Sequence, residues 1–421
     1  MPWSLEKPLG SDDALNRERF ALRMPLLLFE DKERDDPAPK RAAENSFQFI
    51  DRVDDPAFAR VRELFNAWVT RFASLQGDKA TNDLLGRFRS KPDDQFYSAF
   101  WELYLHEVHV RLGFTVRVHP ESDRGTRPDF SLLRDGRSFY LEAVMPTPSS
   151  GEPQQPGNVQ TVMEYIDSAR HPDFFLALRF IAPNRDTPRK REVVHAVEGW
   201  LSSLNWDEWW RGGLCPEIAY PEAEVPVRGW LLGLRALPRS PERRGGALSR
   251  MIGMYPTTTG FPDSVAEAIK PTLDEKANKY GDLDAPYVVA VWTMSAMASE
   301  DTAAQALFGI EMPLEAGSHR TGLPSPAQRD ALWSPARQHR GRASAVLAAT
   351  SWDFNYSSVA RVWPRLWANP GATRALDQQL PYPTTRVSED ETSIENTPAT
   401  TEPSAVLELP TDWPGRPFER L

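Results

Sequence analysis

Stretches with helical periodicity alternate with short apolar stretches along most of this chain, and this alternation limits what it can fold into. Apolar residues recur at helical spacing over 56–75 and about 94–112, which predicts two amphipathic helices. Short β-like runs follow at 114–119, 129–133 and 138–144. Helices interleaved with short strands indicate an α/β or α+β fold, in which helices cover a sheet.

The alternation continues downstream and predicts further elements. In chain order they are a helix at 159–168, a strand at 174–181, a helix at 192–204, a strand at 229–237, a helix at 273–280 and strands at 287–292 and 343–348. We therefore expect one extended α/β domain over 56–382, with its first unit at 92–182 and additional C-terminal α/β elements after it.

Both ends differ in composition from this body. The first 45 residues are charged and interrupted by proline, and the apolar run 24–29 is their only candidate for docking on the body. Residues 1–55 are therefore predicted to form an N-terminal extension. Residues 383–421 contain 8 acids and 3 bases, a balance of −5, and are rich in Thr, Ser and Pro. Such a segment buries little apolar surface, so a disordered acidic tail is predicted.

Composition excludes several classes of protein. No run of about 18 uncharged apolar residues occurs, and the first residues lack the basic and apolar parts of a signal peptide, so a cytoplasmic protein without a membrane segment is expected. The one cysteine, Cys215, rules out an internal disulfide and a cysteine-rich zinc site and is interpreted as a buried thiol.

Catalytic signatures of other classes are missing or misspaced. His106 and His109 lie three apart, whereas the zinc-protease motif needs histidines at i and i+4. They share a helix face with Glu102, so His106 is either a neighbour of a site there or an ordinary surface histidine. Neither a P-loop, a dinucleotide-binding glycine motif nor a serine-hydrolase elbow is present. The tryptophan-rich segment 205–210 is interpreted as packing anchors rather than a base-stacking surface.

Arginines gather in two stretches, although the chain has a net charge of −10. One contains Arg235, Arg239, Arg243, Arg244 and Arg250; the other contains Arg320, Arg329, Arg337, Arg340 and Arg342. These side chains could contact phosphates, or they could be solvated loop charges.

Three acids stand where carboxylates are costly. Glu102 lies on the second predicted helix, Asp129 begins the first strand of a hairpin, and Glu142 lies near the end of the second strand. A tight turn at 134–136 would bring Asp129 beside Glu142. Each acid alone also fits a turn or a solvent-facing strand position. Together they would repel, and a divalent cation with hard oxygen ligands, Mg²⁺ or Mn²⁺, would neutralise them.

The order of helix glutamate, Arg-Pro-Asp-Phe-Ser-Leu-Leu and a hairpin into Phe-Tyr-Leu-Glu-Ala-Val resembles the PD-(D/E)xK, or restriction-endonuclease-like, nuclease superfamily. The resemblance covers about 45 of 421 residues. It implies that Asp129, Glu142 and the main-chain carbonyl of Ala143 hold the metal, with Glu102 assisting. It also implies a central mixed sheet of the restriction-endonuclease type.

The chain departs from the family pattern at the motif lysine. Val144 stands where the family has a lysine to orient and activate the attacking water, and valine can neither donate a hydrogen bond nor stabilise charge. Some members of the family supply this cation from another element. Lys276 and Lys279, just before the strand at 287–292, are the candidates here.

The resemblance implies a divalent-metal-dependent nuclease that hydrolyses DNA phosphodiester bonds, in restriction or defence. The expected partners are DNA and, as an open option, a second copy of the chain as a homodimer. Val144 motivates the alternative of a catalytically inactive protein of the same fold that binds nucleic acid or a protein partner.

Overall fold

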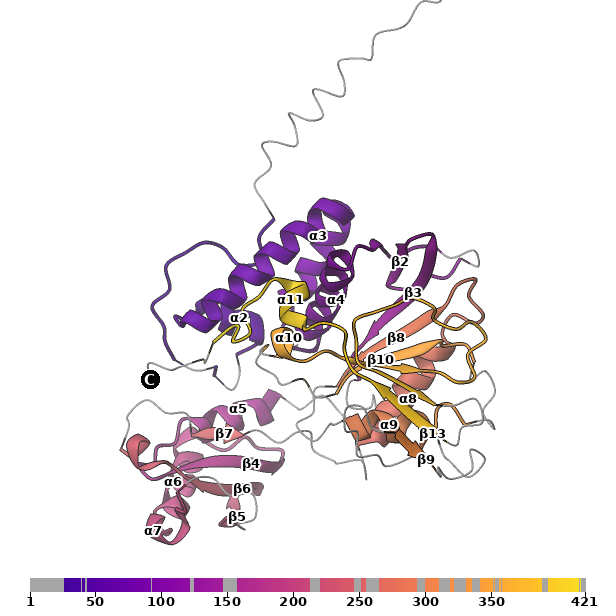
Figure 1. Ribbon diagram of the computed structural model, residues 1–421. Coiled ribbons are helices and arrows are strands. Elements are labelled where there is room, and N and C mark those ends of the chain that lie inside the picture. Colours follow the sequence, from indigo (N-terminus) through magenta and orange to yellow (C-terminus); the bar gives the residue numbers. More distant parts are fainter. Residues whose placement is uncertain are drawn as a thin grey trace, which may run out of the picture.

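The computed structural model of the protein describes most of residues 26–417 (Figure 1). The undescribed positions are 1–25, 39, 42–43, 92, 122–124, 147–156, 213–219, 246–250, 255–264, 294–299, 310–318, 322–330, 335–340, 351, 353–355, 357, 388–392, 416 and 418–421. Across the described part, none of the helices combines the length and the apolar character that crossing a membrane requires.

Helices and strands alternate throughout the described chain. The helices are α2 (Ser46–Arg52), α3 (Pro56–Phe88), α4 (Asp93–Arg111), α5 (Gly157–Asp167), α6 (Lys190–Leu201), α7 (Trp206–Trp209), α8 (Val265–Asn278), α9 (Glu300–Phe308), α10 (Ser358–Arg361) and α11 (Pro403–Leu407). The strands are β1 (Thr115–Val118), β2 (Phe130–Arg134), β3 (Arg137–Val144), β4 (Phe174–Ala182), β5 (Glu222–Val227), β6 (Trp230–Pro238), β7 (Ile252–Met254), β8 (Tyr287–Trp292), β9 (His319–Thr321), β10 (Ala345–Ala349), β11 (Arg365–Ala368), β12 (Thr384–Val387) and β13 (Ser393–Thr397). The expected mixed α/β class is confirmed.

A large mixed sheet has the strand order β1-β2-β3-β8-β10-β11-β12-β13-β9 among the described residues. The first three strands form an antiparallel meander, whereas β3, β8 and β10 run parallel to one another. Parallel neighbours need a crossover, and α8 precedes β8 as α9 precedes β10. The strands β3, β8 and β10 therefore form a parallel group, with an antiparallel meander on one side of it and mixed pairing from β11 to β9 on the other.

Helices cover both faces of this sheet, with α3 and α4 on one side and α8 and α9 on the other (Figure 1). Every residue of β8 is buried. Its alternate side chains divide between the two faces: Val288 and Ala290 pack with α3 and α4, whereas Val289 and Val291 pack with α8 and α9. An uninterrupted apolar run is what such a two-sided strand needs.

Helix α3 is longer than the periodicity indicated, because it contains a break. Asp55 caps its start by accepting from the backbone N–H groups of Ala57 and Phe58. At Gly77 the backbone turns to φ +79° and ψ 174°, which is not helical, and a second helical segment runs on to Phe88. A glycine adopts this conformation without steric cost. The segment after the break places Arg87 beside α4.

The β2–β3 hairpin has the predicted tight turn. Asp135 and Gly136 both have positive φ, 52° and 74°, as a two-residue type I′ turn requires. The register pairs Phe130 with Leu141. Extended by one position, it sets Asp129 opposite Glu142, as the sequence predicted.

The segment between β3 and α8 builds a second sheet, which among its described residues has four strands in the order β5-β6-β4-β7. Helices α5 and α6 cover one face of it, and its apolar cluster shares no residue with those of the large sheet. The sequence assigned 157–182 to the same unit as the acidic pair, and this is wrong. Strand β4 pairs with β6 and β7, while the neighbour of β3 is β8. An apolar run predicts a strand but not its partner.

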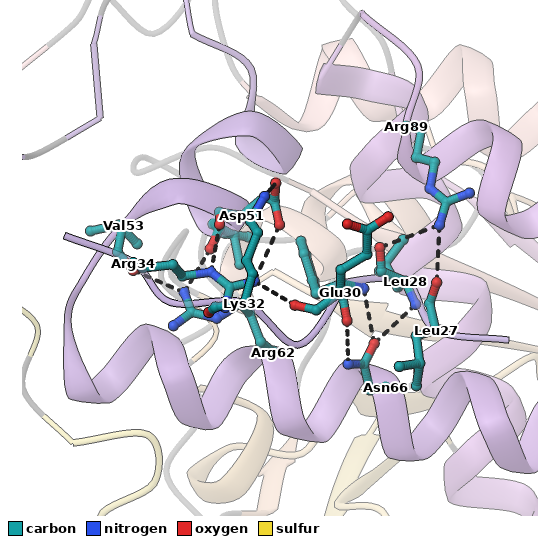
Figure 2. Close-up of polar contacts among 12 residues, drawn as sticks. Leu27, Leu28, Glu30, Lys32, Arg34, Asp51, Val53, Arg62, Asn66 and Arg89 are labelled. Atoms are coloured by element: carbon teal, nitrogen blue, oxygen red, sulfur yellow. Dashed lines mark hydrogen bonds and ion pairs between the residues drawn. The ribbon is translucent and has the colours of Figure 1, made fainter. Parts of the chain in front are cut away.

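The described part of the N-terminal extension docks on α3, and Figure 2 shows its polar contacts. Asn66 accepts from the backbone N–H groups of Leu28 and Phe29 and donates to the carbonyl of Phe29. Leu28 and Phe29 are buried, so the docking expected of the apolar run is confirmed. The buried Arg62 donates to the carbonyls of Ile50 and Val53, which anchors the chain before α3.

The prediction of a disordered tail after residue 382 is wrong. Strands β12 and β13 belong to the large sheet, and α11 packs against α4. Ile394, Leu407 and Trp413 are buried in its cores. These few apolar residues are widely spaced among polar ones, so composition suggested disorder. A preformed sheet edge gives the segment backbone partners that it could not supply itself.

The place of β13 in the large sheet, between β12 and β9, can be tested with two neighbouring residues. We expect Ile394→Ala to lower the free energy of unfolding by about 2–4 kcal/mol, because it removes a buried side chain. The exposed neighbour Glu395 faces solvent, so Glu395→Ala should change it by less than about 0.5 kcal/mol. Urea unfolding measures both changes in the free energy of unfolding. Equal small effects of the two substitutions would instead support a disordered tail.

Candidate active site

Asp129 lies at the start of the hairpin, directly before β2, and its side chain contacts the next strand. Its Oδ2 accepts a hydrogen bond from the backbone N–H of Ala143 at 2.8 Å. Asp129 precedes β2, so its carboxylate accepts the hydrogen bond that a backbone carbonyl of a paired strand would otherwise accept. This contact fixes the Asp129 carboxylate against β3, one residue from Glu142.

Glu142 is 1% exposed, and three side chains from one short segment surround it. Lys279 Nζ lies 2.7 Å and Lys276 Nζ 3.6 Å from its Oε1. The Tyr280 hydroxyl donates to Oε2 at 2.6 Å. Both oxygens of this buried carboxylate are thus satisfied, as a charge on a sheet face requires.

The segment that supplies these groups is the C-terminal end of α8. Lys276 lies in the last turn of the helix, and Lys279 and Tyr280 follow before Gly281 changes the chain direction at φ +67°. The sequence singled out the two lysines but missed Tyr280, which stands next to Lys279 in the same short segment.

The strand geometry explains why position 144 is apolar. Val144 lies two residues after Glu142 and on the same face of β3, in the apolar cluster under α8 and α9. It is 7% exposed, so a lysine there would compete for space with the core. The cations reach Glu142 from the facing helix instead, through side chains that stay partly in solvent.

Glu102 lies on α4, on the opposite side of the sheet from α8. Its two oxygens accept from the guanidinium of Arg87 at 2.5 and 2.6 Å, a bidentate ion pair. Arg87 comes from the second segment of α3. The structure therefore brings Glu102 near Asp129, but the direct partner of Glu102 is Arg87.

The other two acids act electrostatically on Asp129. Burial, then the charges of Glu142 and Glu102, raise the pKa of Asp129 to about 8. The Ala143 N–H and Lys279 act in the opposite direction without cancelling this. Asp129 therefore holds a proton near neutral pH unless a further cation is present.

Lys279 and Tyr280 respond to the same carboxylate. Burial lowers the pKa of Lys279, but its hydrogen bonds to Glu142 and Tyr280 outweigh burial and raise it above its ordinary value. Burial and the hydrogen bond to Glu142 raise the pKa of the Tyr280 hydroxyl. Lys279 is thus held as a cation and Tyr280 as a neutral donor.

The donor set of this site fits a hard divalent cation. Asp129 and Glu142 supply carboxylate oxygens, and burial, followed by the charges of Glu142 and Glu102, raises the pKa of Asp129, so a cation there would favour its charged form. Within the described ranges, no three His, Cys, Asp or Glu side chains are grouped to hold a metal ion. Two carboxylates with a backbone carbonyl and water are a set that Mg²⁺ accepts.

Neither histidine of α4 belongs to the site. His106 and His109 are both fully buried, so the interpretation of His106 as a surface histidine is wrong. His106 Nε2 contacts Gln76, and His109 Nδ1 donates to the carbonyl of Leu105. Burial lowers their pKa values, to about 3 for His106 and about 4 for His109. They are neutral core residues.

Arg235 and Arg239, from the first arginine stretch, contact residues of the small sheet. Arg235 pairs with Glu222, and the buried Arg239 donates to the carbonyl of Phe174. Arg342 of the second stretch lies 3.6 Å from Asp282. Arg250, Arg329, Arg337, Arg340 and Cys215 lie outside the described residues, as do the side chains of Arg243 and Arg320.

The tryptophan-rich segment 205–210 packs as expected. Trp206 donates through Nε1 to the carbonyl of Arg239, and its ring stacks on Trp210. Trp206 and Trp209 lie against the core of the small sheet. These rings act as packing anchors.

Comparisons with known proteins give no family for this chain: no protein-family model matches it, and neither a curated protein nor a solved structure shows significant similarity. Any function of the candidate site must therefore be inferred from the geometry of the site itself.

The raised pKa of Asp129 predicts a pH-dependent stability in metal-free buffer. Folded Asp129 binds its proton more tightly than the unfolded chain, where the carboxyl pKa is about 4. The free energy of unfolding should therefore fall as the pH rises from about 4 to about 8. The Asp129→Asn substitution keeps the shape of the side chain but removes its charge. At pH above 8 the free energy of unfolding of this variant should exceed that of wild type by on the order of 1–3 kcal/mol.

Thermal unfolding at acidic and alkaline pH measures this difference. Asp135→Asn is the matched control, because Asp135 is an exposed residue of the hairpin turn and has no carboxylate neighbour named in the site. A stability difference between Asp129→Asn and wild type that is the same at both pH values would contradict the prediction.

Proposed function

We propose that the protein is a divalent-metal-dependent nuclease that hydrolyses phosphodiester bonds of DNA. The observation that carries this proposal is the cation set at Glu142. Lys279 Nζ lies 2.7 Å from the carboxylate that follows the Pro-Asp motif, where Val144 leaves the family's lysine position without a charge.

The order of elements supports a nuclease-type core. Helix α4, the strands β1, β2 and β3, helix α8 and strand β8 follow one another, with the small-sheet segment inserted between β3 and α8. Trp101 of α4 donates to the carbonyl of Ala290 in β8 at 2.9 Å, and this hydrogen bond connects α4 with β8. This arrangement suits the restriction-endonuclease-like family that the motif resembles.

Each residue has a distinct role in the proposal. Asp129, Glu142 and the carbonyl of Ala143 would hold Mg²⁺ or Mn²⁺, which supplies a Lewis acid for the phosphoryl oxygen. Lys279 would replace the motif lysine by orienting the attacking water and stabilising negative charge, with Lys276 as a second cation. Glu102, held by Arg87, keeps the field around Asp129 negative.

The first test is cleavage of plasmid and single-stranded DNA with Mg²⁺ or Mn²⁺. We expect the wild type to cleave and Asp129→Ala to lose at least about 100-fold in rate, because the metal loses a ligand. Asp135→Asn, six residues away in the turn, should retain wild-type activity. Equal activity of wild type and Asp129→Ala, or no cleavage with either metal, would rule out the proposal.

Lys279 gives a second test, because its two expected effects have opposite signs. Lys279→Met removes a cation from Glu142, so Mn²⁺ should bind more tightly, by about tenfold. Cleavage should nevertheless slow by about 100-fold, because the charge near the attacking water is lost. Lys276→Met, whose Nζ is 3.6 Å from the same oxygen, should show smaller effects of both kinds.

Calorimetric titration with Mn²⁺ and single-turnover cleavage measure the two quantities separately. A parallel fall of affinity and rate would show that Lys279 supports only the fold of the site.

A second candidate function rests on the pairing of the acids. Arg87 holds Glu102, Lys279 and Tyr280 hold Glu142, and the Ala143 N–H holds Asp129. A site neutralised by protein groups suits a catalytically silent member of the fold that binds nucleic acid or a protein partner. Absence of heat on Mn²⁺ titration would favour this function.

A further inference from the structure

Two loops meet at one end of the small sheet. The connection from β4 to α6 contains Asn184, whose Nδ2 donates to the carbonyl of Arg228 in the β5–β6 turn at 3.3 Å. Trp230 Nε1 donates to the carbonyl of Asp186 at 2.8 Å. At Gly229, φ is +80° and an added Cβ would lie 2.2 Å from Asn184 Nδ2, so only glycine allows this approach. The two loops are therefore held together.

These loops and the first turn of α6 present a cluster of cations that we call the basic end. Its members, all exposed, are Arg185, Arg189, Lys190, Arg191 and Arg228. The acids among them are Asp186 and Glu192, so the cluster has an excess of three positive charges. It lies in a chain whose net charge is −10, which makes the excess a local feature.

The cations of the basic end have few acidic partners. Arg228 Nε lies 3.8 Å from Glu192 Oε2, and that oxygen also accepts from the backbone N–H of Arg189 at 2.8 Å. For the side chains of Arg185, Arg189, Lys190 and Arg191, the described chain offers no ion pair and no hydrogen-bond acceptor.

Other arginines of the same unit are engaged. Arg179 and Arg235 pair with Glu222, Arg244 pairs with Asp173 at 2.7 Å, and Arg239 donates to backbone carbonyls. Unpaired positive charge in the described part of the unit is therefore concentrated at the basic end. The positive end of the α6 dipole points into the same region and adds to the potential.

We propose that the basic end binds the phosphate backbone of nucleic acid. Guanidinium groups form bidentate hydrogen bonds with phosphate, and a row of unpaired arginines matches a repeating anion. The large apolar side chains that are exposed in the described chain are Leu75, Leu133 and Val362, none of them at the basic end. A membrane-inserting or protein-docking surface would need such an anchor, which favours nucleic acid.

This inference deepens the proposed nuclease function, on which it rests, by assigning a surface outside the acidic site to the substrate. The acids of the active site repel a polyanion, so the chain needs cations elsewhere to hold DNA. The small-sheet segment leaves the large sheet after β3, which carries Glu142, and returns before α8, whose C-terminal end leads directly into Lys279.

The test is binding of a short fluorescent DNA duplex to the full chain in EDTA, measured by anisotropy over a range of salt. The basic-end variant combines Arg185→Gln, Arg189→Gln, Lys190→Gln and Arg191→Gln. Each lost phosphate contact should reduce the slope of log K against log salt by about 0.9, so we expect a reduction of about 3–4 and at least about tenfold weaker binding at low salt.

The matched control variant removes the same charge from the same unit at engaged positions. It combines Arg179→Gln, Arg235→Gln and Arg244→Gln with Arg211→Gln, whose guanidinium donates to the carbonyl of Trp210 at 3.0 Å. It should bind duplex nearly as well as wild type. Equal losses in both variants, or no loss in the basic-end variant, would overturn the proposal, as would binding only to vesicles of phosphatidylserine and phosphatidylcholine. Should the quadruple variant fail to fold, the double variant Arg189→Gln with Arg191→Gln, expected to lose about half as much of the slope, decides the same question.

The outcome is separable from that of the nuclease proposal, because the assay contains no metal and cleavage is not its readout. Selective loss of binding in the basic-end variant without cleavage by the wild type would contradict the nuclease function alone. Cleavage with undiminished binding by the basic-end variant would contradict the basic end alone.

Discussion

The structure of the candidate site depends on one buried carboxylate. Glu142 sits on the face of a central parallel strand and is 1% exposed, so its charge requires partners from the element packed above it. Helix α8 provides them at its C-terminal end, where Lys276, Lys279 and Tyr280 converge on the two oxygens. The position of α8 on the sheet is thus coupled to the chemistry of β3.

Two different elements can place a cation at the same carboxylate, with different consequences. A lysine two residues after Glu142 on β3 would share its face and occupy apolar space under α8. This chain keeps that space for Val144 and takes its charge from the edge of the facing helix. Packing under α8 and charge at Glu142 are thereby separated, and the lysines retain contact with solvent.

The chain also separates the charges that a polyanionic ligand would meet. Burial and the charges of Glu142 and Glu102 raise the pKa of Asp129, so this group of acids favours cations at the large sheet. The unpaired cations lie in the segment inserted between β3 and α8. The small-sheet segment has its own apolar core, so it can carry such a surface without disturbing the packing around Glu142.

The sequence by itself determined the mixed α/β class, the strand at 287–292, the hairpin turn and the pairing of Asp129 with Glu142, because each follows from local periodicity or turn chemistry. Tertiary structure alone decided which strands share a sheet, that β4 belongs to the small sheet, and that the described residues after 382 add β12 and β13 to the large sheet. It also placed Tyr280 on Glu142, Arg87 on Glu102 and the basic end around Gly229. These depend on contacts between residues far apart in the chain, which periodicity and composition do not encode.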